Sequence, residues 1–65
     1  MYQVEVVWNR EFRFVPFGKE HETIEAAKKY AVDIIDSGDG ARVKKAQVID
    51  LETGEVAVES YKIRD

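Results

Sequence analysis

The residues of this chain with the clearest chemical potential are basic side chains close to aromatic ones. Arg42, Lys44 and Lys45 form a local basic cluster, and Arg10 and Arg13 lie in an aromatic-rich segment near the amino terminus. Basic side chains neutralise phosphates, and aromatic rings stack on unpaired bases. If the fold brings the two segments together, the five basic residues form a surface that can bind nucleic acid.

The same aromatic rings are needed for the core. A chain of 65 residues buries only about 60% of the surface that its unfolded form exposes, so it needs the large side chains that it has. We therefore expect Trp8, Phe12 and Phe14 in the core, and Phe17 and Tyr61 on an exposed contact surface. The formal net charge of −3 also opposes broad attraction to phosphate backbones. Nucleic-acid binding is therefore the alternative interpretation, and not the leading one.

Catalytic and metal-binding motifs are not indicated. His21 has no serine, cysteine or paired carboxylate placed beside it by the sequence, so we expect a solvated loop histidine. The chain has no cysteine for a disulfide or a thiolate metal site, and Asp33, Asp36 and Asp39 do not follow the calcium-loop spacing. The four glycines do not have the spacing of a phosphate-binding loop. We expect no enzyme, no cofactor and no metal.

Two strands are predicted at the amino terminus. Apolar and polar residues alternate over residues 2–8, which is the pattern of a strand with one buried face. A second strand over residues 11–15 follows, and Pro16 ends it or confines it to a sheet edge. A three-residue loop would set Trp8 opposite Phe12, and burial of these rings favours that register.

One amphipathic helix should follow a connection formed by residues 17–20. Thr23 is a good N-cap, and Gly38 or Gly40 can end the helix in the left-handed conformation. The expected core-facing stripe consists of Ile24, Ala27, Ala31 and Ile34.

Two further strands are predicted over residues 43–49 and 56–61, joined by a turn in which Asp50 accepts backbone hydrogen bonds and Gly54 adopts a positive φ. The last few residues resemble a tail. The predicted fold is α+β, a two-layer ββαββ sandwich with one helix on a four-stranded antiparallel sheet of order 2-1-3-4, in a single domain over residues 1–65.

One helix leaves the opposite face of such a sheet open. The alternation predicts an apolar centre on that face, built from Val7, Val15 and Val48, and exposed apolar patches mark interfaces. The leading interpretation is a small non-enzymatic module that binds another protein, or a second copy of itself, through this surface. The predicted contact residues are Val7, Arg13, Val15, Phe17, Val48 and Tyr61.

Two segments carry a resemblance to known proteins. The motifs Thr23-x-Glu25-Ala26-Ala27-x-x-Tyr30-Ala31 and Asp50-x-x-Thr53-Gly54-Glu55-Val56 cover about half of the chain. The chain thereby resembles small ββαββ proteins of bacteriophages and bacterial mobile elements, some of which bind and block a host enzyme. The resemblance implies an inhibitor of a host protein and brings no catalytic residue with it.

No membrane segment or export signal is indicated. The chain has no run that approaches the roughly 20 apolar residues of a spanning helix. An apolar run after a basic amino-terminal segment, typical of a secretory signal, is not seen either. We expect a cytoplasmic protein without a membrane partner.

Overall fold

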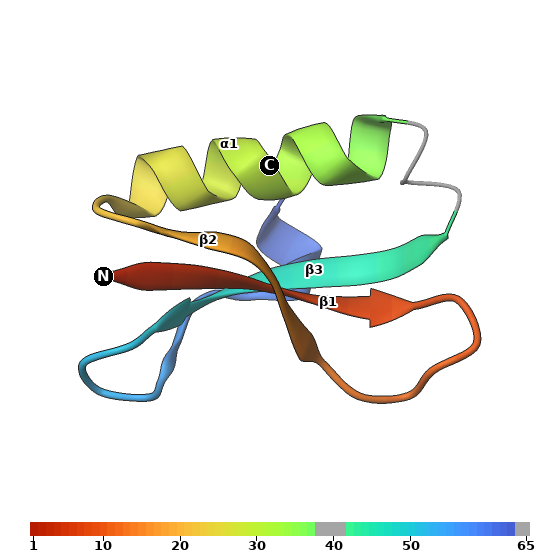
Figure 1. Ribbon diagram of the computed structural model, residues 1–65, viewed down its shortest axis with the longest axis horizontal. Coiled ribbons are helices and arrows are strands. Elements are labelled where there is room, and N and C mark those ends of the chain that lie inside the picture. The colour runs from red at the N-terminus through yellow and green to blue at the C-terminus, as the bar shows by residue number, and fades with distance from the viewer. Residues whose placement is uncertain (38–41, 64–65) are drawn as a thin grey trace.

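The computed structural model describes residues 1–37 and 42–63. Within them lie β1 (Tyr2–Trp8), β2 (Val15–His21), α1 (Ile24–Asp36), β3 (Val43–Asp50), β4 (Val56–Val58) and the short 3-10 helix η2 (Ser60–Lys62). The strands form one antiparallel sheet of order β2-β1-β3-β4, and α1 packs on one of its faces (Figure 1). The predicted ββαββ sandwich and its strand order are therefore confirmed.

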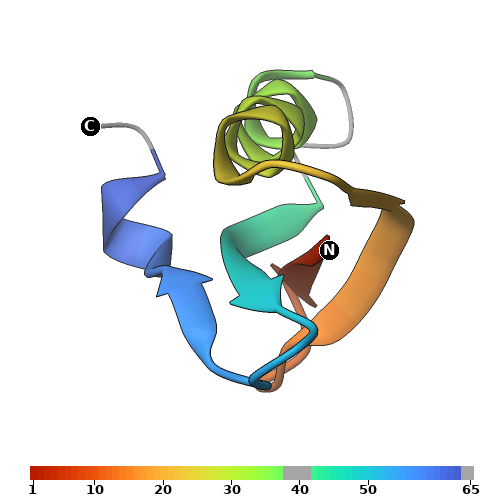
Figure 2. The ribbon, with the colours of Figure 1, turned by 90° about the vertical axis from the view of Figure 1, so that its left-hand side faces the viewer.

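The sheet is strongly twisted around the helix. In the end-on view of Figure 2, β2 and η2 lie on opposite sides of α1, with β1 and β3 beneath the helix. The sheet therefore curves around the side of the helix that faces it.

The core lies between α1 and the sheet. From α1 it takes Ala27, Ala31 and Ile34, which are at most 5% exposed. The sheet and the carboxyl-terminal segment supply Val4, Val6, Val43, Ala46, Val48 and Ile63. Small alanine side chains let the helix approach the sheet closely, because no bulky group separates the two backbones. The predicted stripe on α1 is confirmed except at Ile24, which is 37% exposed.

The ends of α1 are capped by side chains. The Thr23 hydroxyl accepts a hydrogen bond from the Ala26 N–H at 3.1 Å, which confirms the predicted N-cap. At the other end, the Ser37 N–H donates to the Asp33 carbonyl and its hydroxyl donates to the Ile34 carbonyl. The predicted helix-ending residues Gly38 and Gly40 lie outside the described residues.

The second strand begins later than the sequence suggested. In the structure Val6 pairs with Val15, and residues 9–14 form the loop, so the prediction that Trp8 lies opposite Phe12 is wrong. Phe12 is 93% exposed on this loop instead of buried. The later start places Val15 and Phe17 against the core, which provides apolar contact in place of Phe12.

Two local features make this late strand feasible. β2 is an edge strand, where Pro16 can pair with Glu5 without removing a hydrogen bond from the middle of the sheet. The β1–β2 register then shifts between Gln3 and Glu5, and Gly18 adopts a φ of +79° at this irregularity. The Gln3 side-chain amide donates to the carbonyls of Phe17 and Gly18, at 3.2 and 3.1 Å, and so satisfies groups that the shift releases.

The turn between β3 and β4 is the one that the sequence predicted. The Asp50 carboxylate accepts from the Glu52 N–H at 2.9 Å, Gly54 has a φ of +77°, and Ile49 pairs with Val56. The Gly54 N–H also donates to the Asp50 carbonyl at 2.7 Å, which closes the loop.

The carboxyl-terminal segment differs from the prediction. β4 ends at Val58 and the chain turns into η2, after which Ile63 is only 1% exposed in the core. The expectation of a strand over residues 56–61 followed by a loose tail is therefore wrong for residues 59–63. A 3-10 turn of three residues has no apolar–polar periodicity, so the sequence pattern does not predict that the apolar residue after it is buried.

Candidate functional site

The predicted apolar centre of the open sheet face is not present. Val7 is 1% exposed and Val48 is fully buried, so neither can form part of an exposed contact surface. Val48 pairs with Val4 in β1, and paired residues share a face, so Val48 lies under the helix. Val15 is half-buried and packs against the same core. The alternation of apolar and polar residues placed Val48 on the open face, and it gives no sign of the register shift between Val48 and Ile49 in the pairing with β4.

The open face has a polar centre. The Gln47 amide donates to the Glu5 carboxylate at 2.9 Å, between neighbouring positions of β1 and β3. Val7 does lie on this face, in register with Lys45, and the Lys45 Nζ lies 5.5 Å from the centre of the Phe14 ring. We attribute the burial of Val7 to this lysine and to the loop ring beside it. The middle of the open face therefore offers no apolar patch.

Phe17 is also placed differently from the expectation of an exposed contact residue. It is half-buried, its ring meets the edge of Trp8 at a centroid distance of 5.5 Å, and it stacks on Tyr30 at 6.4 Å. Tyr30 in turn contacts His21 at 5.0 Å. These four contacting rings link β1, β2 and α1. Of the remaining predicted contact residues, Arg13 is exposed and Tyr61 is 71% exposed.

His21 is a buried strand residue, so the expectation of a solvated loop histidine is wrong. It is 9% exposed at the end of β2 and pairs with Tyr2. Its Nε2 atom has no hydrogen-bond partner among the described residues. The imidazole therefore acts here as a packing ring against Tyr30.

The two basic segments of the sequence meet at one end of the sheet. The Asn9 N–H donates to the Arg42 carbonyl at 2.7 Å, and the Lys44 Nζ donates to the Glu11 carbonyl at 3.3 Å. These bonds join the β1–β2 loop to the start of β3 (Figure 1). We call residues 8–14 together with residues 42–45 the basic end.

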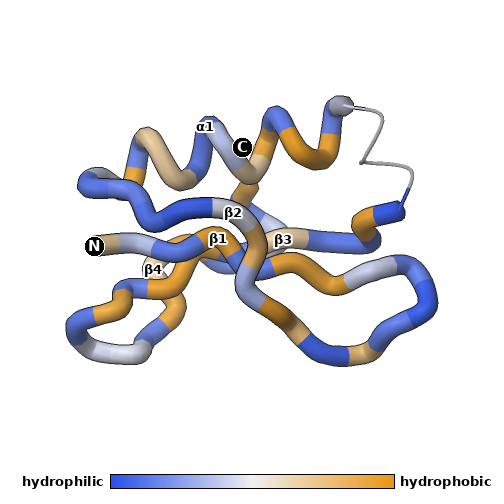
Figure 3. The backbone as a smooth tube through the Cα atoms, viewed as in Figure 1, coloured by the Kyte–Doolittle hydropathy of each residue, from blue (hydrophilic) through white to orange (hydrophobic). Residues whose placement is uncertain are grey.

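The basic end gathers the five basic residues that the sequence singled out. Arg10, Arg13, Arg42, Lys44 and Lys45 are all exposed there, and Glu11 is the one acidic residue in these two segments. The segments carry a net charge of +4 within a chain of net charge −3, which leaves −7 for the remaining residues. Figure 3 shows hydrophilic residues along most of this loop and a short hydrophilic stretch within the first half of β3. Positive charge is therefore concentrated at the basic end despite the acidic total charge of the chain.

Two aromatic rings at the basic end carry cations on their faces. The Lys44 Nζ lies 5.1 Å from the centre of the Phe12 ring, in addition to the Lys45–Phe14 pair. Phe12 itself lies on the loop, almost fully in water. A small domain that exposes a phenylalanine gives up about 1.5–3 kcal/mol of burial, which makes this ring a candidate contact residue.

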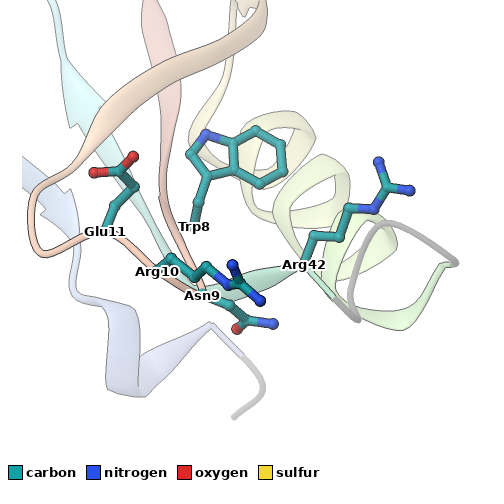
Figure 4. A pocket seen from close by; sticks show the side chains of 5 residues that line it. All are labelled: Trp8, Asn9, Arg10, Glu11 and Arg42. Atoms are coloured by element: carbon teal, nitrogen blue, oxygen red, sulfur yellow. The ribbon is translucent and has the colours of Figure 1, made fainter.

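Trp8 is the half-buried centre of the basic end. A groove of about 310 Å³ beside it is lined by Trp8, Asn9, Arg10, Glu11 and Arg42. Figure 4 shows the indole between the Glu11 and Arg42 side chains, with Arg10 near its base. A second groove of about 480 Å³ is lined by Trp8, Glu11, Arg13 and Val15. Three guanidinium groups therefore border grooves in which one indole is accessible.

Other kinds of site are not seen in the described parts of the chain. Residues 1–37 and 42–63 contain no group of three or more histidine, aspartate or glutamate side chains that could hold a metal ion. Asp39, which was considered with Asp33 and Asp36, lies outside these residues. No helix in the same ranges is both long enough and apolar enough to cross a bilayer.

Comparisons with protein family models, with curated proteins and with solved structures find no match to this chain. The resemblance to small proteins of bacteriophages and mobile elements therefore stays a prediction.

Proposed function

We propose that this chain is a small non-enzymatic binding module whose contact surface is the basic end, and whose partner presents negative charge. The observation that carries the proposal is the convergence of five exposed cations and an exposed phenylalanine from two segments distant in the sequence. Aromatic and arginine side chains are the residues that most often dominate binding surfaces. Electrostatic complementarity then selects and orients the partner.

The basic end replaces the open sheet face as the proposed contact surface. The face offers a polar centre in which Glu5 and Gln47 already bond to each other, and Val7, the one of the three predicted valines that lies on it, is buried. Arg13 is the one residue common to the predicted face contacts and the basic end. Binding to a host protein, as the resemblance implies, remains compatible with this proposal if that protein presents an acidic surface.

Retention on immobilised heparin tests whether the basic end binds a polyanion. We expect the protein to be retained at about 50 mM salt in spite of its net charge, because the cations are concentrated at one end. The double variant Arg10→Glu/Arg13→Glu should lose most of this retention.

A matched control separates the position of the charges from their sum. Lys29 lies on the exposed side of α1 and Lys62 lies in η2, and both are exposed outside the basic end. The double variant Lys29→Glu/Lys62→Glu lowers the net charge by the same amount and should elute close to the parent protein. Failure of the parent protein to bind, or equal losses in the two variants, would contradict the proposal.

A further inference from the structure

We propose that the partner of the basic end is single-stranded nucleic acid, with Phe12 and Trp8 as stacking platforms for unpaired bases. This inference rests on the proposed function, because it names the partner of the same surface. The inference starts from accessible aromatic rings that lie next to basic side chains. A duplex cannot use these rings fully, because its bases are already stacked on one another.

The first platform is Phe12. Its ring is 93% exposed, so both the approach of a base and a face for stacking are available without unfolding of the core. Lys44 lies over this ring, close enough to pair with a phosphate next to a stacked base. Stacking on an aromatic side chain does not depend strongly on the identity of the base.

The second platform is Trp8, in the middle of the two grooves. Arg10 and Arg42 line the groove of about 310 Å³ together with Trp8, and Arg13 lines the groove of about 480 Å³ together with Trp8. These volumes fall in the range of sites that hold one small ligand, and a nucleotide is of this size. Arginine binds a phosphate through two parallel hydrogen bonds and also stacks on a base.

The length of the surface also fits a short stretch of strand. The whole molecule measures 29 × 21 × 20 Å, and the basic end occupies one of its ends. A surface of this width spans only a few nucleotides. We therefore expect weak, strongly salt-dependent binding of short segments without sequence preference.

Glu11 provides a separate test of the proposal, because this acidic residue lines both grooves. A negative charge there repels a phosphate that the arginines attract. Removal of this charge should therefore strengthen binding to nucleic acid, which is an effect that damage to the fold cannot produce.

The experiment uses the fluorescence of Trp8, which is the chain's one tryptophan. The probe is a single-stranded oligothymidine of about 12 nucleotides, which matches the site sizes of small single-strand-binding domains. We expect saturable quenching at about 50 mM salt, with a salt slope of about −0.7 for each phosphate contacted. A duplex of the same length should bind at least about fivefold more weakly, because its bases are not available for stacking.

Three variants and one control define the contacts. Phe12→Ala should weaken binding about fivefold or more. Arg10→Gln should also weaken binding, and it should reduce the magnitude of the salt slope by about 0.7 because one phosphate contact is lost. Glu11→Gln should strengthen it about two- to fivefold. The control is Tyr61→Ala, because Tyr61 is also exposed and also has a lysine over its ring, 5.6 Å from Lys62 Nζ, but lies in η2. This variant should bind like the parent protein.

The outcomes separate this inference from the proposed function. Absence of quenching at low salt, or binding of the duplex as tight as that of the single strand, would overturn the single-strand inference. If heparin retention still depended on Arg10 and Arg13 in that case, the basic end would remain a contact surface, and its partner would be an acidic protein. Loss of both signals would remove both proposals.

Discussion

Replacement of Gly18 by alanine should destabilise the protein by about 2–4 kcal/mol, which is most of the stability that a domain of this size has. Gly18 adopts a φ of +79°, a conformation that costs an alanine about 1–2 kcal/mol. In addition, the new Cβ would lie 2.7 Å from two ring atoms of Tyr30 and would overlap its hydroxyl group. Tyr30 packs between Phe17 and His21, so its displacement would disturb the aromatic rings between β2 and α1. Urea denaturation followed by circular dichroism measures the loss.

Gly54→Ala is the matched control for this prediction. Gly54 has nearly the same φ, +77°, but a Cβ there would meet no other atom within 4 Å. This variant should lose only the conformational cost of about 1–2 kcal/mol. Equal losses in the two variants would show that Tyr30 moves aside without cost, and would contradict tight packing of its ring between Phe17 and His21.

Replacement of Ile63 by alanine should cost about 2–4 kcal/mol, even though only two residues follow it in the given sequence. Ile63 is 1% exposed and belongs to the core that joins α1, β1 and β3. Truncation of its side chain leaves a cavity that the short η2 segment can fill only in part. The midpoint of urea unfolding measures the effect.

The control for Ile63 is its exposed neighbour Tyr61, whose substitution by alanine should change stability by no more than about 0.5 kcal/mol. If Ile63→Ala were equally mild, the carboxyl-terminal segment would be a tail, as its sequence suggested, and the core would end at β4.

The parts of the fold that the sequence predicts are those specified by local chemistry. Thr23 as an N-cap, the alanines of α1 and the turn from Asp50 to Gly54 each depend on neighbours within a few residues. Strand order followed from a wider requirement, that every neighbouring pair of strands be antiparallel, and this includes β1 and β3, which are distant in the sequence. The cap, the alanines and the turn need no knowledge of how distant segments meet.

The errors lie where a register decides which side of the sheet a residue faces. Phe12 and Val15 both fit an alternating strand, and the choice between them depends on Tyr30 and Phe17 packing together across the sheet and the helix. Val48 was placed on the wrong face because an irregularity between Val48 and Ile49 is invisible in an alternating pattern. A shift of one residue reverses the face of each side chain in a strand, so one such error moves a whole predicted surface.

The candidate site shows the same division. The sequence identified Arg10, Arg13, Arg42, Lys44 and Lys45 as one group, and the structure brings them together. The sequence did not predict that Phe12 lies exposed among these basic residues, since this ring was expected to be buried in the small core. Pro16 and Gly18 were the residues that could have indicated the later strand, because their presence after the predicted strand is compatible with an irregular edge strand.

The most direct test of the basic end as the contact surface is an NMR titration of the isotope-labelled protein with the oligothymidine or with a heparin oligosaccharide. We expect shifts of the backbone amides of residues 8–14 and 42–45 and of the Trp8 indole N–H, with β4, η2 and the exposed side of α1 unchanged. Shifts that centre on the open sheet face around Glu5 and Gln47, or on Tyr61, would show that the contact surface lies elsewhere and would contradict the proposed binding at the basic end.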